Sequence, residues 1–440
     1  MLRSAIKTIT TAAAFSVISL VGCSTAPPTQ EGAKAPASFA AVPGEKGGQD
    51  VSGPYDVVAD WPKPLTSLPG HEKWTWGAVE GIFAESPDRV YILQRGELPA
   101  LKRPPNTPVP QFGPSLSFPV NEVPFRNASQ GPVAALPGEG GPGAAGTGLE
   151  NGLWKGKIGV DGRWEHVLVV VNSNGDIVEN WSQWDKMLKR PHAIYVNPYD
   201  AEKNVWVVDD AGHSVYKFTH DGKKLLLTLG TPGKEGADAT HFNRPTFIAW
   251  APDSTMWVAD GYNGTRVAKF DKDGKFLLDW GKPGIRVNMS IPEVETRPGY
   301  FNAVHGIAYD PDTHKVFVND RSNRRIQVFD ENGKFLDMWS TGTQSTVYCL
   351  LITADHHIWA PDSRTWKLLE YDEDGHFLYS WGSQGDWPGA MWGAHQISVD
   401  QEGNLYMAEV SNGRAQKFRP RQGARPELLV GQPFRSAAWK

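Results

Sequence analysis

The sequence repeats one pattern of short apolar runs and turns, and this repetition limits the fold more than any other feature. Each unit begins with an apolar run, followed by a second run that ends in an acidic residue and a third that ends in Phe-Asp or a similar pair. An Asn-Gly or Asp-Gly turn then leads into a fourth run, which ends in Trp-Gly. The clearest copies lie at 205–230, 256–281, 316–340 and 358–382; a fifth opens at 405, and a divergent first copy includes 90–96 and 166–182. Such self-similarity is typical of a chain that repeats one supersecondary unit around a common core.

Each copy is interpreted as four short antiparallel strands. Apolar and polar residues alternate within the runs, which is the period of a half-buried strand. Asn-Gly and Asp-Gly pairs tolerate positive φ and therefore predict tight hairpins. These pairs lie at 174–175, 221–222, 273–274, 332–333 and 374–375.

Six copies of four strands predict an all-β fold, a six-bladed β-propeller over residues 54–440. With the insertion described below set aside, about 53 residues remain for each blade, near the usual repeat length. A seven-bladed ring would need a further copy that the sequence does not contain. The last copy lacks its Trp-Gly strand, and we expect residues 55–61 to supply that strand and fasten the ring.

The first 53 residues are predicted to be a targeting signal followed by a tether. Arg3 and Lys7 precede a short apolar segment that ends in Leu-Val-Gly-Cys, which resembles a bacterial lipobox. Residues 1–22 are therefore predicted to be a lipoprotein signal peptide, with lipid attached to Cys23. Residues 23–53 contain few bulky apolar residues and are predicted to be disordered. We expect a lipid-anchored protein of the cell envelope, on the periplasmic face of the outer membrane; the alternative is an exported protein with an incidental cysteine.

An insertion rich in proline and glycine is expected inside blade one, at about 97–165. Residues 131–148, for example, read GPVAALPGEGGPGAAGTG. A connection of this length is either a mobile decoration or a lid at one mouth of the channel.

Charge and cysteine content exclude several classes of protein. The 44 basic and 49 acidic residues give a net charge of −5, which offers no basic surface for nucleic acid or anionic lipid. Two cysteines among 440 residues exclude a disulfide-rich scaffold and a cysteine-based zinc finger.

One position at the start of each innermost strand holds the candidate metal-binding residues. In blade order it is occupied by Glu80, His192, Thr246, His305, Cys349 and His395. Histidine thus recurs in every second blade, and alternate blades of a six-fold ring are 120° apart. A lone histidine there would be a channel residue bonded to water, but three converging imidazoles predict a metal site with an open position. Zinc is the expected metal, because imidazole suits it and no redox partner is evident.

From these residues onward, the chain resembles peptidyl-α-hydroxyglycine α-amidating lyase and, more broadly, NHL-repeat propellers. The resemblance covers about residues 75–420, and its most specific stretches are VADGY at 258–262, PGYF at 298–301 and DRSNRRIQ at 320–327. It implies zinc ligands at His192, His305 and His395, a catalytic tyrosine at Tyr262, and active-site arginines at Arg95 and Arg321. The family has a calcium-binding Asp where this chain has Gln396, so calcium is doubtful.

The resemblance implies a carbon–nitrogen lyase whose small-molecule or peptide substrate is a carbinolamide, which yields an amide and glyoxylate. Removal of the hydroxyl proton needs a base, and cationic neighbours favour the phenolate form of a tyrosine. Arginine binds a carboxylate through its two-pronged guanidinium. Another carbinolamide or another small acid stays open as the natural substrate.

Two other functions stay open at this stage. A lactonase-like hydrolase would use the same metal to activate water, and such enzymes bring carboxylates to the metal, for which Glu80 is the candidate. A non-enzymatic NHL-repeat binding protein of the envelope would bind no metal.

Overall fold

The computed structural model describes residues 51–100, 160, 162–285 and 295–439, and the backbone of 107–108 and 117–118. Every described residue belongs to one compact unit, which lies within Phe39–Lys440. The predicted signal peptide 1–22, the tether up to residue 50 and most of the insertion lie outside the described residues. Within the described residues no helix has the length and apolar character needed to cross a membrane.

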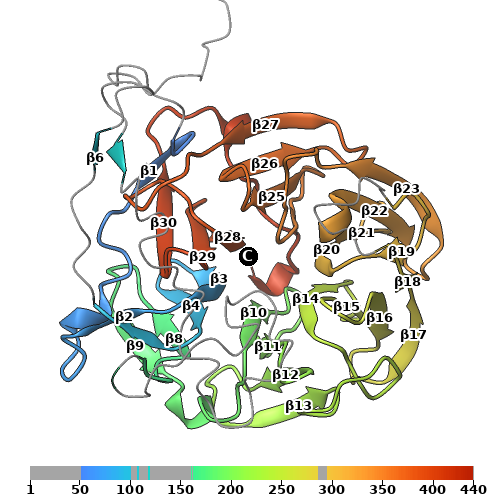
Figure 1. Ribbon diagram of the computed structural model, residues 1–440, viewed down its shortest axis with the longest axis horizontal. Helices are drawn as coiled ribbons and strands as arrows, with labels where there is room; N and C mark the ends of the chain where they lie inside the picture. The colour runs from blue at the N-terminus through green and yellow to red at the C-terminus, as the bar shows by residue number, and fades with distance from the viewer. Residues whose placement is uncertain are drawn as a thin grey trace, which may run out of the picture. The chain divides into compact units, whose positions relative to one another are not determined.

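The described residues form six four-stranded antiparallel sheets arranged as blades around a central axis (Figure 1). The first three blades are β3 (Val79–Ser86), β4 (Arg89–Gln94), β8 (Leu168–Val171) and β9 (Ile177–Asn180); β10 (Pro191–Val196), β11 (Val205–Asp209), β12 (Ser214–Phe218) and β13 (Leu225–Leu229); and β14 (Pro245–Trp250), β15 (Met256–Asp260), β16 (Arg266–Phe270) and β17 (Phe276–Trp280). The last three are β20 (Val304–Asp310), β21 (Lys315–Asp320), β22 (Arg325–Asp330) and β23 (Phe335–Ser340); β24 (Leu351–Ile352), β25 (Ile358–Asp362), β26 (Lys367–Tyr371) and β27 (Phe377–Trp381); and β28 (Ala394–Val399), β29 (Leu405–Glu409), β30 (Arg414–Pro420) and β1 (Tyr55–Val57). The predicted six-bladed propeller is therefore confirmed.

Short elements join or flank the blades. They are the pairs β2 (Trp74–Trp76) with β5 (Glu97–Pro99), β6 (Thr107–Pro108) with β7 (Ser117–Phe118) and β18 (Lys282–Pro283) with β19 (Tyr300–Phe301), and the 3₁₀ turns η1 (Leu65–Ser67), η5 (Ser182–Trp184), η6 (Arg321–Asn323), η7 (Pro426–Leu428) and η8 (Ala437–Trp439).

The ring is closed by a strand from the N-terminal side, as the sequence predicts. β1 pairs antiparallel with β30, with Tyr55 opposite Pro420 and Val57 opposite Phe418. The strand is shorter than expected, because it ends at Val57. Trp61 follows it and packs edge-on against Tyr406, with ring centroids 5.0 Å apart.

The repeated Trp-Gly and hairpin pairs have one structural cause. A Cβ added to the hairpin residue Gly333 would lie 2.6 Å from the ring of Trp280, which ends the outer strand of the preceding blade. Gly375 meets Trp339 in the same way. Both glycines have a φ of +83°, so a side chain there would be strained as well as blocked. These two blades thus hold the tryptophan of the preceding blade against their own hairpin, as blade two does with Gly222 and Trp181.

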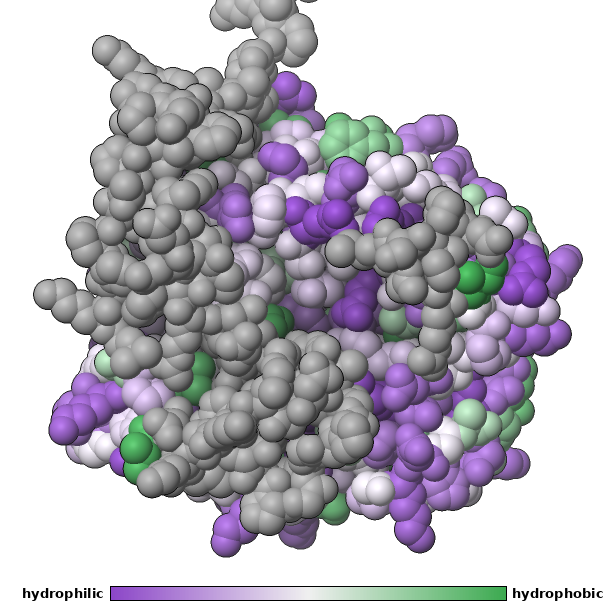
Figure 2. Space-filling view, in the orientation of Figure 1, coloured by the Kyte–Doolittle hydropathy of each residue, from purple (hydrophilic) through white to green (hydrophobic). Residues whose placement is uncertain are grey.

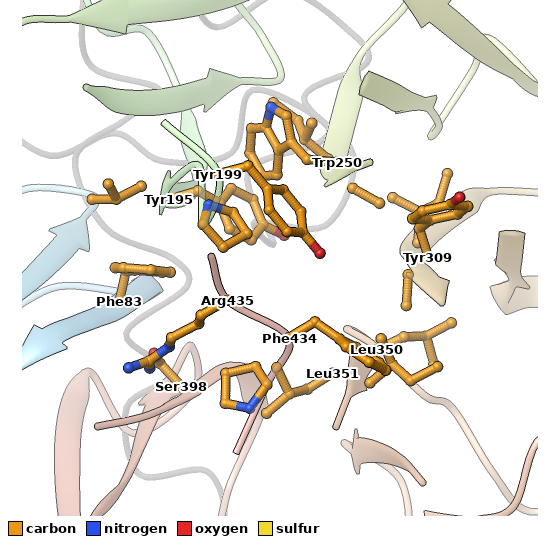
Figure 3. A pocket seen from close by; sticks show the side chains of 18 of the residues that line it. Phe83, Tyr195, Tyr199, Trp250, Tyr309, Leu350, Leu351, Ser398, Phe434 and Arg435 are labelled. Carbon is orange, nitrogen blue, oxygen red and sulfur yellow. The ribbon is translucent and has the colours of Figure 1, made fainter. Parts of the chain in front are cut away.

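The C-terminal segment lies across one end of the channel, which the sequence did not predict. Figure 1 places the C-terminus at the centre of the ring. Ser436 donates its backbone N–H to Pro198 in blade two, Arg435 hydrogen-bonds the Val399 carbonyl in blade six, and Trp439 packs against Phe83 in blade one. Above the segment lies a cavity of about 130 Å³ with mainly apolar walls (Figure 3), lined by Phe83, Tyr195, Trp250, Tyr309, Phe434 and others.

Candidate active site

The loop that enters each inner strand is fixed by one recurring hydrogen bond. The residue three places before the inner-strand position donates its backbone N–H to the side chain that ends the second strand, at 2.6–2.9 Å in every blade. The donor–acceptor pairs are Gly77–Gln94, Lys189–Asp209, Asn243–Asp260, Asn302–Asp320, Thr346–Asp362 and Trp392–Glu409. The acidic end of the second strand, visible as a repeat in the sequence, therefore sets where the channel-lining side chain begins.

A register shift then turns that side chain toward the axis. The pairing of the first two strands is interrupted around His192, His305 and His395, each of which lies inside a shift. Bulges of this kind re-aim a side chain at the edge of a sheet. The three histidines are buried, and one ring nitrogen from each lies within 4.8 Å of the others.

The outer nitrogen of each imidazole is held by a backbone carbonyl. Nδ1 of His192 donates to the Thr246 carbonyl at 3.0 Å, and Nδ1 of His305 donates to that of Tyr348 at 2.9 Å. Nδ1 of His395 donates to the Glu80 carbonyl at 2.6 Å. With Nδ1 protonated, each Nε2 has its lone pair free, which is how metal-binding histidines are usually oriented.

The environment keeps the three imidazoles neutral. Burial lowers the pKa of His192 and of His305 well below the usual value, and the neighbouring histidines or Arg321 lower it further. Burial lowers the pKa of His395 to about 3. His395 Nε2 is buried and has no hydrogen-bond partner within the described residues. Three neutral nitrogen donors and an unpartnered buried Nε2 fit a bound metal ion such as zinc.

A second histidine cluster, that of His71 and His166, differs from the channel trio in its hydrogen-bond partners. Nδ1 of His71 and Nδ1 of His166 lie 2.9 and 2.6 Å from the two carboxylate oxygens of Glu97. One carboxylate thus bridges both imidazoles of that cluster, whereas the carboxylate beside the channel trio, that of Glu80, is paired with only one of the three imidazoles, at His395 Nε2, 3.4 Å away, among the described residues.

Tyr262 lies directly at the trio. Its hydroxyl is 3.1 Å from His192 Nε2 and 3.2 Å from His305 Nε2. The turn that carries it needs glycine at position 261, because a Cβ there would be 1.8 Å from the carbonyl oxygen of Val304. Close contact between this turn and blade four therefore places the tyrosine between two of the three histidines.

Arg321 lies beside Tyr262 without an ion pair among the described residues. Its Cζ is 4.8 Å from the centroid of the Tyr262 ring and 5.3 Å from that of Tyr348. The arginines that follow the same turn in the sequence behave differently. Arg266 and Arg325 each donate Nε to the Asp that ends the second strand, at 2.8 Å. Arg321 is thus free to contact a ligand, whereas Arg266 and Arg325 form hydrogen bonds that stabilise the blades.

Arg95, which the resemblance implies as an active-site arginine, is buried beside Glu80. Its Nη1 is 2.6 Å from Glu80 Oε1, and its Nε donates to the Pro191 carbonyl at 3.2 Å. The second oxygen of Glu80 is 3.4 Å from His395 Nε2. Arg95 therefore fixes Glu80 beside the trio through an ion pair, and its Nη2 is without a hydrogen bond among the described residues.

Several residues of the site were not singled out by the sequence. Phe247 packs against all three imidazoles, with centroid distances of 5.1, 5.1 and 5.3 Å, and forms a floor beneath them. The Tyr348 ring packs against His305 and His395. Arg190 and Arg244 also lie near Tyr262, with Cζ 5.9 and 4.4 Å from the centroid of its ring, and Asp210 lies near both. Figure 2 shows a hollow near the centre of the face turned toward the viewer, with hydrophilic residues on its wall.

Gln396 occupies the position where the resemblance raises the question of calcium. Its Oε1 accepts from the Ile82 and Ile194 N–H groups at 3.3 and 3.1 Å, and its Nε2 donates to the Ile194 carbonyl at 2.8 Å. The amide therefore joins three blades through their backbones with hydrogen bonds alone.

No protein-family model matches this chain. It is 34% identical over 170 residues to the peptidylglycine alpha-amidating monooxygenase of Rattus norvegicus, covering 38% of this chain and 16% of that protein. It is 28% identical over 281 residues to the peptidyl-alpha-hydroxyglycine alpha-amidating lyase 1 of Drosophila melanogaster, covering 60% of this chain and 50% of that protein. It is 32% identical over 167 residues to the NHL repeat-containing protein 3 of Mus musculus, covering 36% and 44%.

The chain thus spans from about a sixth to half of the length of these relatives. It has homologues among the amidating lyases and among the NHL-repeat proteins, as its motifs indicate. Among solved structures it is similar to a virginiamycin B lyase from Staphylococcus aureus, with 12% identity and a TM-score of 0.42 over 83% of this chain and 99% of that one. That similarity is too low to bear on the reaction.

Proposed function

We propose that this relative of the amidating lyases is a zinc-dependent lyase that cleaves the C–N bond of a carbinolamide. The observation that carries the proposal is the Tyr262 hydroxyl, which lies within 3.2 Å of two imidazole nitrogens of the trio and beside the unpaired Arg321. His192, His305 and His395 would hold the metal. When bound, zinc would supply Lewis acidity toward an oxygen of the substrate.

The chain's own residues supply the remaining chemistry. Deprotonated Tyr262 accepts the proton of the substrate hydroxyl, the oxygen electrons form the aldehyde C=O of glyoxylate, and the C–N bond breaks. The departing nitrogen takes up a proton and leaves as the amide, so atoms and charge balance. Arg321 binds the carboxylate that becomes that of glyoxylate. Phe247 closes the space beneath the imidazoles against water.

A hydrolase of the lactonase type is the second candidate, because one carboxylate oxygen of Glu80 lies 3.4 Å from His395 Nε2. A base at that place would activate water rather than remove a substrate proton. Burial raises the pKa of Glu80, and the Arg95 guanidinium, 2.6 Å from its other oxygen, offsets that rise in part.

Parallel assays separate the two functions. Purified, zinc-loaded protein would be incubated with an α-hydroxyglycine-extended peptide and, separately, with a panel of aldonolactones. We expect loss of the peptide and no catalysed opening of the lactones. Lactone hydrolysis that depends on Glu80, tested with Glu80→Gln, would assign the site to the hydrolase.

We also propose that the propeller is anchored at the cell envelope by lipid on Cys23 and acts there on a small-molecule or peptide substrate. The Leu-Val-Gly-Cys sequence at 20–23 supports this location. Cys23→Ser is expected to move the protein from the membrane fraction to the soluble fraction while the lyase rate per molecule stays the same. Wild-type protein that fractionates with the cytoplasm would contradict the anchor.

A further inference from the structure

Arg190 is a buried arginine that the proposed chemistry does not use. Its side chain is 1% exposed, and none of its three guanidinium nitrogens has a hydrogen-bond partner within the described part of the chain. Leaving a buried cation without hydrogen bonds is costly, and such groups are normally paired or bind a ligand. The guanidinium therefore has its full hydrogen-bonding capacity left for an anion.

The position of Arg190 in the fold is fixed. Its backbone N–H donates to Asp209 Oδ1 at 2.7 Å, and its carbonyl accepts from the N–H of Asp210 at 3.1 Å. It precedes the inner-strand residue His192 by two places. Its Cζ lies 5.9 Å from the centroid of the Tyr262 ring, so the free guanidinium is at the edge of the candidate active site.

Asp210 holds the surrounding cations together without satisfying Arg190. Its Oδ1 is 3.6 Å from Arg190 Nη1, and its Oδ2 is 3.6 Å from Arg95 Nη2 and 3.5 Å from Arg244 Nη2. These are ion-pair distances too long for hydrogen bonds. One carboxylate shared among three guanidiniums orients them and leaves Arg190 without a hydrogen bond among the described residues.

Arg190 therefore differs from the other two arginines that carry a role in the site. Arg95 has a Glu80 oxygen at 2.6 Å, and Arg321 binds the carboxylate at the reacting carbon in the proposed reaction. Arg190 has only the Asp210 carboxylate, 3.6 Å away, and no hydrogen bond within the described residues. A second anionic group on the substrate would supply the missing hydrogen bonds.

We infer that Arg190, oriented by Asp210, binds a second carboxylate on the substrate, on the acyl side of the C–N bond that is cleaved. This inference rests on the proposed lyase function and names its substrate class: a small acidic carbinolamide with two carboxylates. A planar guanidinium fork with no protein partner matches a carboxylate in two parallel hydrogen bonds. Arg190 is then a residue that determines specificity, and Arg321 binds the carboxylate at the reacting carbon.

Paired substrates that differ only in charge test this directly. The peptides N-acetyl-Glu-α-hydroxyglycine and N-acetyl-Gln-α-hydroxyglycine have the same shape, and kcat/KM would be measured for each with wild type and with Arg190→Met. We expect wild type to prefer the Glu peptide by about 10–100-fold, the usual worth of a charged hydrogen-bonded pair. Arg190→Met should bring the ratio close to one. A ratio near one in wild type, or an unchanged ratio in the variant, would overturn the inference.

Arg190→Lys is a second variant that keeps the test decisive if Arg190→Met does not fold. The substitution keeps the charge and loses the fork, so the ratio should fall severalfold but stay above that of Arg190→Met. Circular dichroism would establish that each variant is folded. If Arg190→Met does not fold, an identical preference for the Glu peptide in wild type and Arg190→Lys would contradict the two parallel hydrogen bonds from the guanidinium.

Direct binding separates this inference from the proposed reaction. Glutarate, a dicarboxylate, would be titrated calorimetrically into zinc-loaded wild type and Arg190→Met, with inorganic phosphate as a second probe. If neither peptide releases glyoxylate but glutarate binds at least tenfold more weakly to the variant, the lyase proposal fails and the carboxylate site stands. Equal glutarate affinity in both proteins, or phosphate bound more tightly than glutarate, would contradict the carboxylate site.

Discussion

Replacing Tyr262 with phenylalanine is expected to lower the rate of glyoxylate release by about 10²–10⁴-fold, the usual worth of a positioned acid–base group. The change removes only the oxygen that lies 3.1 and 3.2 Å from His192 and His305 and leaves the ring beside Arg321. Folding and metal content should therefore hold. The measurement is single-turnover glyoxylate release, with zinc determined by mass spectrometry on the same sample.

Tyr348→Phe is the matched control, because Tyr348 also packs under Arg321 and against two of the histidines. Burial raises the pKa of Tyr348, so less of it is in the phenolate form that could accept a proton near neutral pH. Its effect on the rate should be clearly smaller than that of Tyr262→Phe. Full activity of Tyr262→Phe would remove the tyrosine from the reaction and leave Glu80 as the next candidate base.

Replacing His305 with alanine is expected to abolish tight metal binding and, with it, activity. Three imidazoles held by rigid strands and backbone carbonyls lose little entropy when they bind an ion, so wild type should retain stoichiometric zinc through dialysis. Two imidazoles are too few to close the site. The metal content of dialysed protein measures this, and circular dichroism should show the propeller still folded.

His376→Ala is the corresponding control. His376 lies in an exposed hairpin and hydrogen-bonds Asp372 at 2.7 Å, away from the channel. Its loss should leave zinc content unchanged. Wild-type protein that holds no transition metal and takes none up would contradict the metal centre.

The sequence predicts the blades and the position of the trio because both follow from the repeat. Alternation, hairpin pairs and terminal tryptophans recur at fixed offsets, so aligning the copies also aligns the residues that line the channel. His192, His305 and His395 emerge from that alignment alone. The resemblance adds Tyr262, and the structure places it at the same point.

Residues outside the repeat could not be found in this way. Phe247 faces the histidines only because a register shift between Pro245 and Ile248 breaks the alternation of the strand. Arg190 and Asp210 flank the inner and second strands of blade two, and the pairing of β10 with β11 brings them together at positions that the alignment of the copies does not single out. The C-terminal segment contacts blades one, two and six through isolated contacts, and no periodic pattern in the sequence predicts them.

The most direct test of the proposed reaction is the stoichiometry of its two products. Zinc-loaded wild type and His305→Ala would be given the same α-hydroxyglycine-extended peptide, and both the glyoxylate and the peptide amide would be quantified by mass spectrometry over time. The lyase should release the two in equal amounts, well above the uncatalysed rate, and the variant should not. Wild type that holds stoichiometric zinc yet forms neither product faster than buffer, with neutral and acidic peptides alike, would contradict it.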